Sequence, residues 1–191
     1  MNKKLIALTT LLCISIPTLT GCASTLSSQD QSSHQSMMGD EASGFSANDI
    51  MFAQMMIPHH QQALDMSELA LSIAQSPDVL ELAAQIKAEQ DPEITLMRSW
   101  LTSAGASEDM GHGSHGMGGM LSEEEMAALL QASGPEFEKL FLEGMILHHE
   151  GAIDMTQMIQ DSKNPEVKAL AESIVSSQQI QIDYMKTLLA R

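Results

Sequence analysis

The chain contains two copies of a mixed histidine and methionine motif whose side chains could bind a metal ion. In each copy, a methionine is followed three and four positions later by two adjacent histidines, and then by a second methionine. The residues are Met56, His59, His60 and Met66 in the first copy and Met145, His148, His149 and Met155 in the second. Thioether and imidazole without thiolate favour Cu(I), and imidazole also binds Cu(II). The motif therefore predicts copper binding.

Helical spacing would bring the groups of each motif together. On an α-helix, Met56 lies one turn before both imidazoles, and Met66 lies two turns after His59. Because each copy has its own soft ligands, the pattern favours a separate site in each copy over one shared ion. The alternative is that His59 and His148 are hydrogen-bonded core histidines. Asp65 and Asp154 fall on other helix faces, so we expect surface roles for them.

A second group of possible ligands lies in a glycine-rich stretch, residues 105–120. Its members are Met110, His112, His115, Met117 and Met120. A loop loses conformational entropy when it closes on an ion, so these residues predict a weaker, collecting site. The alternative is a solvated linker.

The similarity between the two copies extends well beyond the motif. Ser76-Pro77-Asp78-Val79 matches residues 164–167, and further matched positions follow. These are Gln90, Ile94 and Met97, which match Gln178, Ile182 and Met185. An internal repeat of this kind predicts a duplicated helical hairpin.

Helix signals place the elements of each hairpin. The spacing of Ser46 and Asp49 has the form of a capping box, and so does that of Ser122 and Glu125. Proline follows a capping residue at Ser76 and Asn164. We predict helices over 46–75, 76–102 and 123–132, then one that begins at Gly134-Pro135 and carries its seam to Ile159, and a last one from Asn164-Pro165 to near Arg191. Pro58 should bend the first helix, and Pro92 should either kink or split the second. The fold class is all-α, a four-helix bundle of two repeated hairpins.

Apolar residues at steps of three and four predict which helix faces are buried. In the two motif helices one histidine of each pair, His59 or His148, lies within this apolar seam, which comprises Phe52, Met56, His59, Ala63, Met66, Ala70 and Ile73, then Phe141, Met145, His148, Ala152, Met155 and Ile159. In the second helix of the first repeat we expect Leu80, Ala83, Ile86, Ile94, Met97 and Leu101 to point inward.

The N-terminus has the features of an export signal. Lys3 and Lys4 precede an apolar segment that is too short to span a membrane. It ends in Leu19-Thr20-Gly21-Cys22, which resembles the lipobox of bacterial lipoproteins. We expect a signal peptide over 1–21, lipidation of Cys22, a disordered tether over 22–46 and a bundle over 47–191. Within the bundle, repeat one is 47–104, the short helix is 122–133 and repeat two is 135–191. The alternative is a plain secretory signal.

Charge and cysteine content narrow the possible functions. The formal net charge of −16 argues against binding to nucleic acid or to anionic lipid, and it raises the local cation concentration. Cys13 would leave with the signal peptide, so Cys22 would be the only remaining cysteine. A soft-metal site in the mature protein would therefore use thioether and imidazole, which remain usable where thiols are oxidised.

These motifs resemble the bacterial family known as domain of unknown function 305. The resemblance rests on Met-Ile-x-His-His-x-x-Ala in both copies and on the run Phe141–Ile146. It implies a ferritin-like four-helix bundle, with copper-binding periplasmic or secreted members, and it places the motif histidines and methionines at the ligand positions. The chain departs from the pattern at Pro92, in its long loop, and at Leu147, where the first copy has Pro58.

We therefore expect an extracytoplasmic copper-binding lipoprotein that serves sequestration, tolerance or trafficking. Its partners would be copper ions and other copper-handling proteins, with contact to the membrane only through the lipid anchor. A di-metal oxidase would need Glu-x-x-His, which does not occur here, so we do not expect an enzyme. The alternative is a methionine-rich helical module that binds a partner protein or an apolar ligand without metal.

Overall fold

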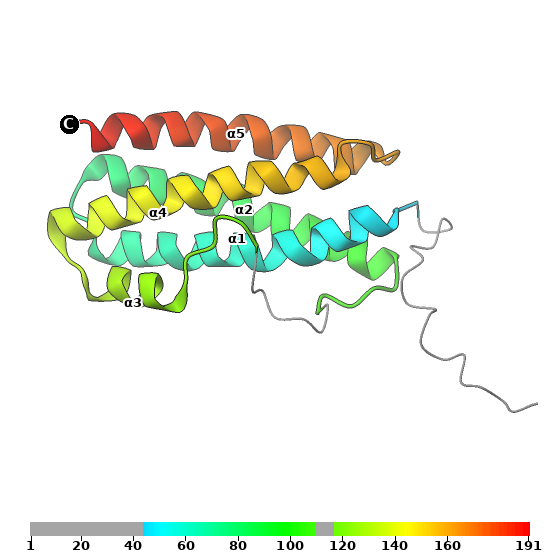
Figure 1. Ribbon diagram of the computed structural model, residues 1–191, viewed down its shortest axis with the longest axis horizontal. Helices are drawn as coiled ribbons and strands as arrows, with labels where there is room; N and C mark the ends of the chain where they lie inside the picture. The colour runs from blue at the N-terminus through cyan, green and yellow to red at the C-terminus, as the bar shows by residue number, and fades with distance from the viewer. Residues whose placement is uncertain (1–43, 110–116) are drawn as a thin grey trace, which may run out of the picture. The chain divides into compact units, whose positions relative to one another are not determined.

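A computed structural model describes residues 44–109 and 117–191 of the chain, and these residues are helical, with no strand among them. Four long helices form a bundle, with one short helix beside it (Figure 1). The elements are α1 (Ala47–Ile73), α2 (Pro77–Ser103), α3 (Glu123–Gln131), α4 (Gly134–Met155), the 3-10 helix η2 (Thr156–Ile159) and α5 (Pro165–Leu189). The predicted bundle of two hairpins is confirmed.

Local capping explains where most of these helices begin. Ser46 and Ser122 each form a complete capping box, and the Asn164 side chain accepts hydrogen bonds from the first turn of α5. The prediction for Ser76 is wrong in detail, because its side chain makes no capping hydrogen bond. Instead, the Glu138 carboxylate of α4 accepts hydrogen bonds from the backbone N–H groups of Gln75 and Ser76.

The interior prolines do not end their helices. Pro58 lies inside α1 and Pro92 inside α2, and both helices continue past them. The predicted single helix after Gly134 is interrupted instead at Met155, where α4 passes into η2. The buried seam continues through this change, since Ile159 at the end of η2 is buried.

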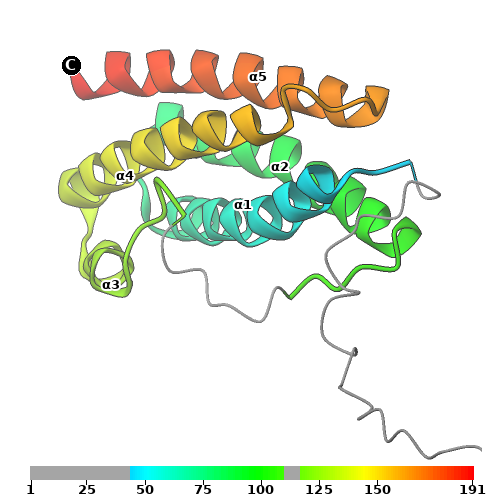
Figure 2. The ribbon, with the colours of Figure 1, turned by 45° about the vertical axis from the view of Figure 1, so that its right-hand side comes forward.

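The connection between the two hairpins spans the length of the bundle. Helices α1 and α2 are antiparallel, as are α4 and α5, while α2 and α4 run in the same direction (Figures 1 and 2). Residues 104–133, which we call the crossover, must therefore return along the bundle before α4 begins. One long crossover of this kind is typical of ferritin-like bundles.

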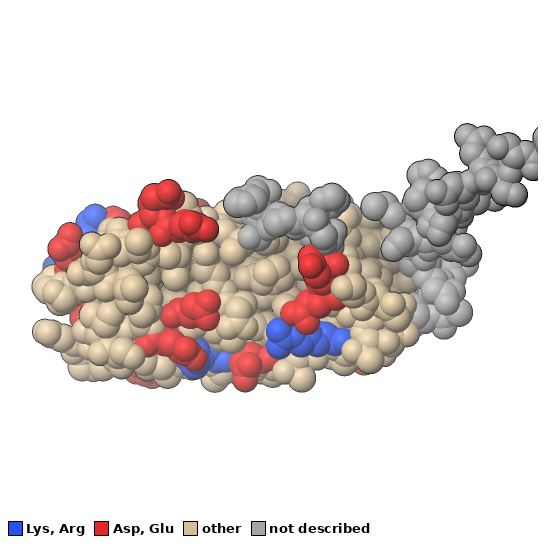
Figure 3. Space-filling model, turned by 90° about the horizontal axis from the view of Figure 1, so that it is seen from below, with Lys and Arg blue, Asp and Glu red and all other residues tan. Residues whose placement is uncertain are grey.

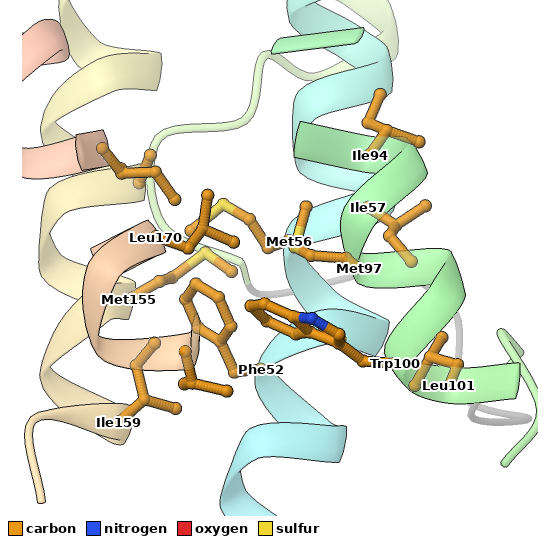
Figure 4. Packing of buried hydrophobic residues seen from close by; sticks show 14 of the residues in the cluster. Phe52, Met56, Ile57, Ile94, Met97, Trp100, Leu101, Met155, Ile159 and Leu170 are labelled. Atoms are coloured by element: carbon orange, nitrogen blue, oxygen red, sulfur yellow. The ribbon is translucent and has the colours of Figure 1, made fainter. Parts of the chain in front are cut away.

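The apolar core is divided into two clusters. The cluster near the start of α1 contains Phe52, Met97 and Trp100 (Figure 4), and the other contains Phe137 and Phe141. The sequence had predicted that Leu80 points inward, but Leu80 is only half-buried. Its neighbours Val79 and Leu82 are buried in the second cluster instead. In each long helix, polar side chains lie where one cluster gives way to the other. We call this set the polar layer: His59, His60, Gln90, Glu93, His148, His149, Gln178 and Gln181.

Acidic groups are common on the surface. On the face seen from below in Figure 1, Asp and Glu side chains are more widespread than Lys and Arg (Figure 3). Among the described residues, no helix combines the length and apolar character that a membrane crossing needs.

Candidate metal centre

The four motif histidines lie in the polar layer and are fully buried. His59 and His60 come from α1, and His148 and His149 come from α4, each with 0% of its surface exposed. His59 and His148 occupy seam positions, whereas His60 and His149 lie beside the seam and face the second helix of their own hairpin. Burying a polar ring is unfavourable unless it is hydrogen-bonded, so the partners of each imidazole matter.

The inner histidines of the two repeats contact each other. The ring centroids of His59 and His148 are 3.8 Å apart. The His148 Nε2–H donates to the backbone carbonyl oxygen of His59 at 2.9 Å, and the His59 Nε2–H donates to the carbonyl oxygen of Gly118 at 3.2 Å. The two histidine pairs therefore lie next to each other where α1 meets α4.

The outer histidines are held by the second helix of their own hairpin. His60 Nε2 lies 2.8 Å from the Glu93 carboxylate of α2. His149 Nε2 lies 2.6 Å from Gln181 Oε1 of α5, and Gln181 in turn donates to Glu89 at 2.8 Å. Burial raises the pKa of Glu89, and the nearby Glu93 carboxylate adds to this effect.

Each of the four imidazoles uses Nε2 in its hydrogen bond. All four Nδ1 atoms are buried, and none of them has a hydrogen-bond partner in the part of the chain that the structure describes. Burial lowers the pKa of His59 to about 3 and that of His149 to about 4, and it lowers the pKa of His148 well below 6.5. These three rings are therefore neutral at pH 7, which is the form that binds metals.

In the core, each motif methionine of one repeat belongs to the same cluster as a motif methionine of the other repeat. Met56 of α1 and Met155 of α4 belong to one core cluster and point toward one another (Figure 4). Met66 of α1 and Met145 of α4 belong to the other cluster. Along each of the two helices, the inner histidine thus lies between a methionine of one cluster and a methionine of the other.

Part of the crossover covers the inner histidines. We call residues 117–121 the strap. Gly118 accepts the hydrogen bond from His59, and the backbone N–H and C=O groups of Leu121 both bond to the Gln62 side chain. Against α4, a side chain on Gly151 would place its Cβ 2.1 Å from the Gly118 oxygen. The strap can lie this close only because residue 151 is glycine.

Of the candidate ligands in the glycine-rich stretch, only Met117 and Met120 belong to the described residues. Met117 and Met120 are half-buried in the strap, and Met120 lines an open groove of about 550 Å³ together with Glu150 and Asp154. Met110, His112, His115 and Cys22 lie outside the described residues. Asp65 and Asp154 are exposed, as predicted.

The donors that are present fit a soft metal better than a hard one. Within residues 44–109 and 117–191, no three His, Cys, Asp or Glu side chains are grouped closely enough to hold a metal ion. A site here therefore needs methionine sulfur in addition to imidazole, or a movement of the side chains. Buried neutral imidazoles with free Nδ1 atoms, flanked by thioethers, are the donor set that Cu(I) prefers.

Sequence reasoning missed the partners of the outer histidines. Glu93 and Gln181 occupy equivalent positions of the two repeats, three residues after the matched pair Gln90 and Gln178. Polar residues at inward positions between Ile86 and Ile94 of α2 were the signal that could have revealed them.

Comparison with known proteins identifies relatives of nearly the whole bundle. The family model for Domain of unknown function (DUF305) matches residues 49–189. An uncharacterized protein of Acanthamoeba polyphaga mimivirus is 43% identical over 53 residues, which is 27% of this chain and 35% of that protein.

Solved structures share both the fold and part of the sequence. A DUF305 fragment from Deinococcus radiodurans is 34% identical, with a TM-score of 0.71, over 77% of this chain and 98% of that one. A Streptomyces coelicolor DUF305 protein inferred to be secreted is 31% identical, with a TM-score of 0.69, over 75% and 92%. CopM in its Cu(II)-bound form is 32% identical, with a TM-score of 0.61, over 73% and 94%, and it has also been solved with Cu(I) and with silver.

Proposed function

This chain belongs to the family described as Domain of unknown function (DUF305), and we propose that it binds copper outside the cytoplasm. The ligands would be the four buried histidines and the methionines on either side of them. The observation that carries this proposal is the set of four buried imidazoles, each with Nε2 engaged and Nδ1 free. Similarity to CopM, which was solved with copper and silver bound, supports it.

The proposed centre is shared between the repeats. The contact of His59 with His148 and the mixed methionine pairs favour one centre at the α1–α4 junction over a separate site in each hairpin. Copper bound there would be cargo, held for sequestration, tolerance or trafficking, and not a catalyst. Other copper-handling proteins would be the partners that deliver or receive it.

A weaker collecting site on the crossover completes the proposal. It would use Met110, His112, His115, Met117 and Met120, and Met120 lies in a groove beside the acidic side chains of Glu150 and Asp154. Acidic groups raise the local concentration of cations, so this groove is a suitable entry point.

A competition titration tests the function. The full chain, purified in detergent, is titrated with Cu(I) against a chromophoric chelator and compared with a variant in which all four histidines are replaced by Leu. Leu keeps the volume of the buried rings, and circular dichroism checks that the helices persist. We expect tight binding to be lost in this variant. Changing the five crossover ligands to Ser should remove only weakly held copper. Undiminished tight binding by the histidine variant would reject the copper centre and favour the metal-free interaction module.

The membrane attachment has a separate test. We propose that Cys22 is lipidated, so Cys22→Ser should move the protein from the membrane fraction to the soluble extracytoplasmic fraction. Cys13→Ser is the matched control, because it removes a thiol from the signal segment without affecting the lipobox-like sequence. Retention of the Cys22→Ser protein in the membrane would contradict lipid anchoring. The Streptomyces coelicolor relative inferred to be secreted supports export of this chain.

A further inference from the structure

The hydrogen bonds of the polar layer determine which nitrogen of each imidazole carries the proton. The partners of the inner histidines are the backbone carbonyl oxygens of Gly118 and His59, which can only accept. A neutral imidazole has one N–H, so His59 and His148 must carry it on Nε2. Their Nδ1 atoms then have lone pairs that point into the protein with no donor to meet them.

The outer histidines reach the same state through side chains. His60 Nε2 lies 2.8 Å from Glu93, and His149 Nε2 lies 2.6 Å from the Gln181 amide oxygen. The orientation of that amide is set by Glu89, which accepts from Gln181 Nε2 at 2.8 Å and so keeps Oε1 turned toward His149. Both outer rings therefore also keep the proton on Nε2 and leave Nδ1 free.

The two outer partners occupy equivalent positions but differ in charge. Glu93 and Gln181 align in the internal repeat, and each lies on the second helix of its hairpin. A carboxylate that accepts from the far N–H of a ligating histidine makes the ring a stronger donor and adds negative charge near the ion. An amide of nearly the same shape orients the ring without bringing a charge into contact with it, since the Glu89 carboxylate lies one hydrogen bond further away.

This inference rests on the proposed copper centre. We propose that Glu93 and Gln181, the latter held in place by Glu89, are positioning residues. Glu93 presents Nδ1 of His60 to the metal, and Gln181 presents Nδ1 of His149. We further infer that they make the two halves of the centre unequal. The half that contains Glu93 favours Cu(II), and the half that contains Gln181 favours Cu(I), because a nearby negative charge stabilises the more highly charged ion.

Exchanging the two partners tests the difference in charge. Glu93→Gln keeps an acceptor of the same size, as used in repeat two, and should weaken Cu(II) binding about tenfold more than Cu(I) binding. For a one-electron couple, a tenfold change in this ratio corresponds to a shift of about 59 mV toward Cu(I). Gln181→Glu should shift the ratio in the opposite direction. Glu81→Gln, at an exposed position of the same helix α2, is the matched control and should leave the ratio unchanged. Equal effects of Glu93→Gln and Glu81→Gln would overturn the charge difference.

Nitrogen-15 NMR of the metal-free full chain tests the positioning role independently of copper binding. All four buried histidines should show the Nε2–H tautomer in the native protein. Glu93→Leu should change the tautomer of His60 alone, and Gln181→Leu that of His149 alone, whereas Glu93→Gln should change neither. An Nδ1–H tautomer at His60 and His149 in the unmodified chain would overturn the positioning role, even if copper binds. Correct tautomers without copper binding would reject the proposed function and leave the positioning of the rings established.

Discussion

Each of the two repeats buries an equivalent pair of adjacent histidines, but the groups around the two pairs differ. In the hairpin of α1 and α2, the outer histidine contacts a carboxylate, Glu93. In the hairpin of α4 and α5, it contacts an amide, Gln181, whose orientation depends on Glu89 from the other hairpin. The duplicated buried donors are therefore nearly symmetric, while the groups behind them are not.

A second difference between the repeats is the way in which α1 and α4 contact the strap. Position 62 of α1 is glutamine and forms two hydrogen bonds to the Leu121 backbone. The equivalent position of α4, Gly151, has no side chain and lets the strap backbone touch the helix. One repeat holds the strap with a side chain and the other makes room for it. Both observations indicate that the repeats have diverged around one common centre.

Removing one histidine pair at a time is the strongest test of this shared centre. The variant His59→Leu with His60→Leu is compared with the variant His148→Leu with His149→Leu in the same copper titration. Because the methionine pairs are mixed and the inner rings touch, each double variant should lose tight copper binding by more than about a hundredfold. If each variant instead kept half of the tightly bound copper, the sites would be separate and the repeats independent.

Acid should destabilise the metal-free protein through the buried histidines of both repeats. Burial holds the pKa of His59 near 3 and that of His148 well below 6.5. The unfolded chain binds protons at these rings as the pH falls below about 6.5, while the native state does not, so the free energy of unfolding decreases down to the native pKa. Each histidine should contribute a slope of about 1.4 kcal/mol per pH unit in this window.

Single variants compare the two inner histidines directly. His59→Leu and His148→Leu should each flatten the dependence of unfolding free energy on pH by the contribution of one proton, as measured by denaturant unfolding between pH 7 and pH 4.5. An unchanged slope in either variant would show that this ring binds its proton as readily in the native state as in the unfolded chain. An unchanged slope in only one variant would show that the two repeats differ at their inner positions as well.

The smallest expected effect lies at the strap. Gly151→Ala would force the Gly118 oxygen away from α4, and such overpacking costs about 1–3 kcal/mol. Gln62→Ala removes two hydrogen bonds, each contributing about 0.5–1.5 kcal/mol. Thermal melting and limited proteolysis at the crossover would measure both effects. Gly118→Ala is the control, since a Cβ there meets no atom within 4 Å. A neutral Gly151→Ala substitution would show that the strap does not depend on close contact with α4.

Most of the fold could be predicted from local sequence signals. The capping boxes at Ser46 and Ser122 determined where two helices begin, and the periodic seam correctly buried Met56, His59 and Met66. The failures had local causes that a periodic pattern does not contain. Ser76 lost its capping role because Glu138, from a helix remote in sequence, satisfied the same backbone groups.

Helical periodicity predicted that His59 and His148 would be buried beside methionines, because steps of three and four residues place them on the inner face of a helix. The burial of His60 and His149, and the contact between the two histidine pairs, depend on the packing of the whole bundle. Helix direction and register depend on the crossover and on packing between distant segments. Inward polar residues of α2 could therefore signal that buried partners exist, but not that His59 meets His148, His60 meets Glu93 and His149 meets Gln181. The local sequence shows which residues can donate to a metal, but the packing of the bundle determines which groups and charges surround each of them.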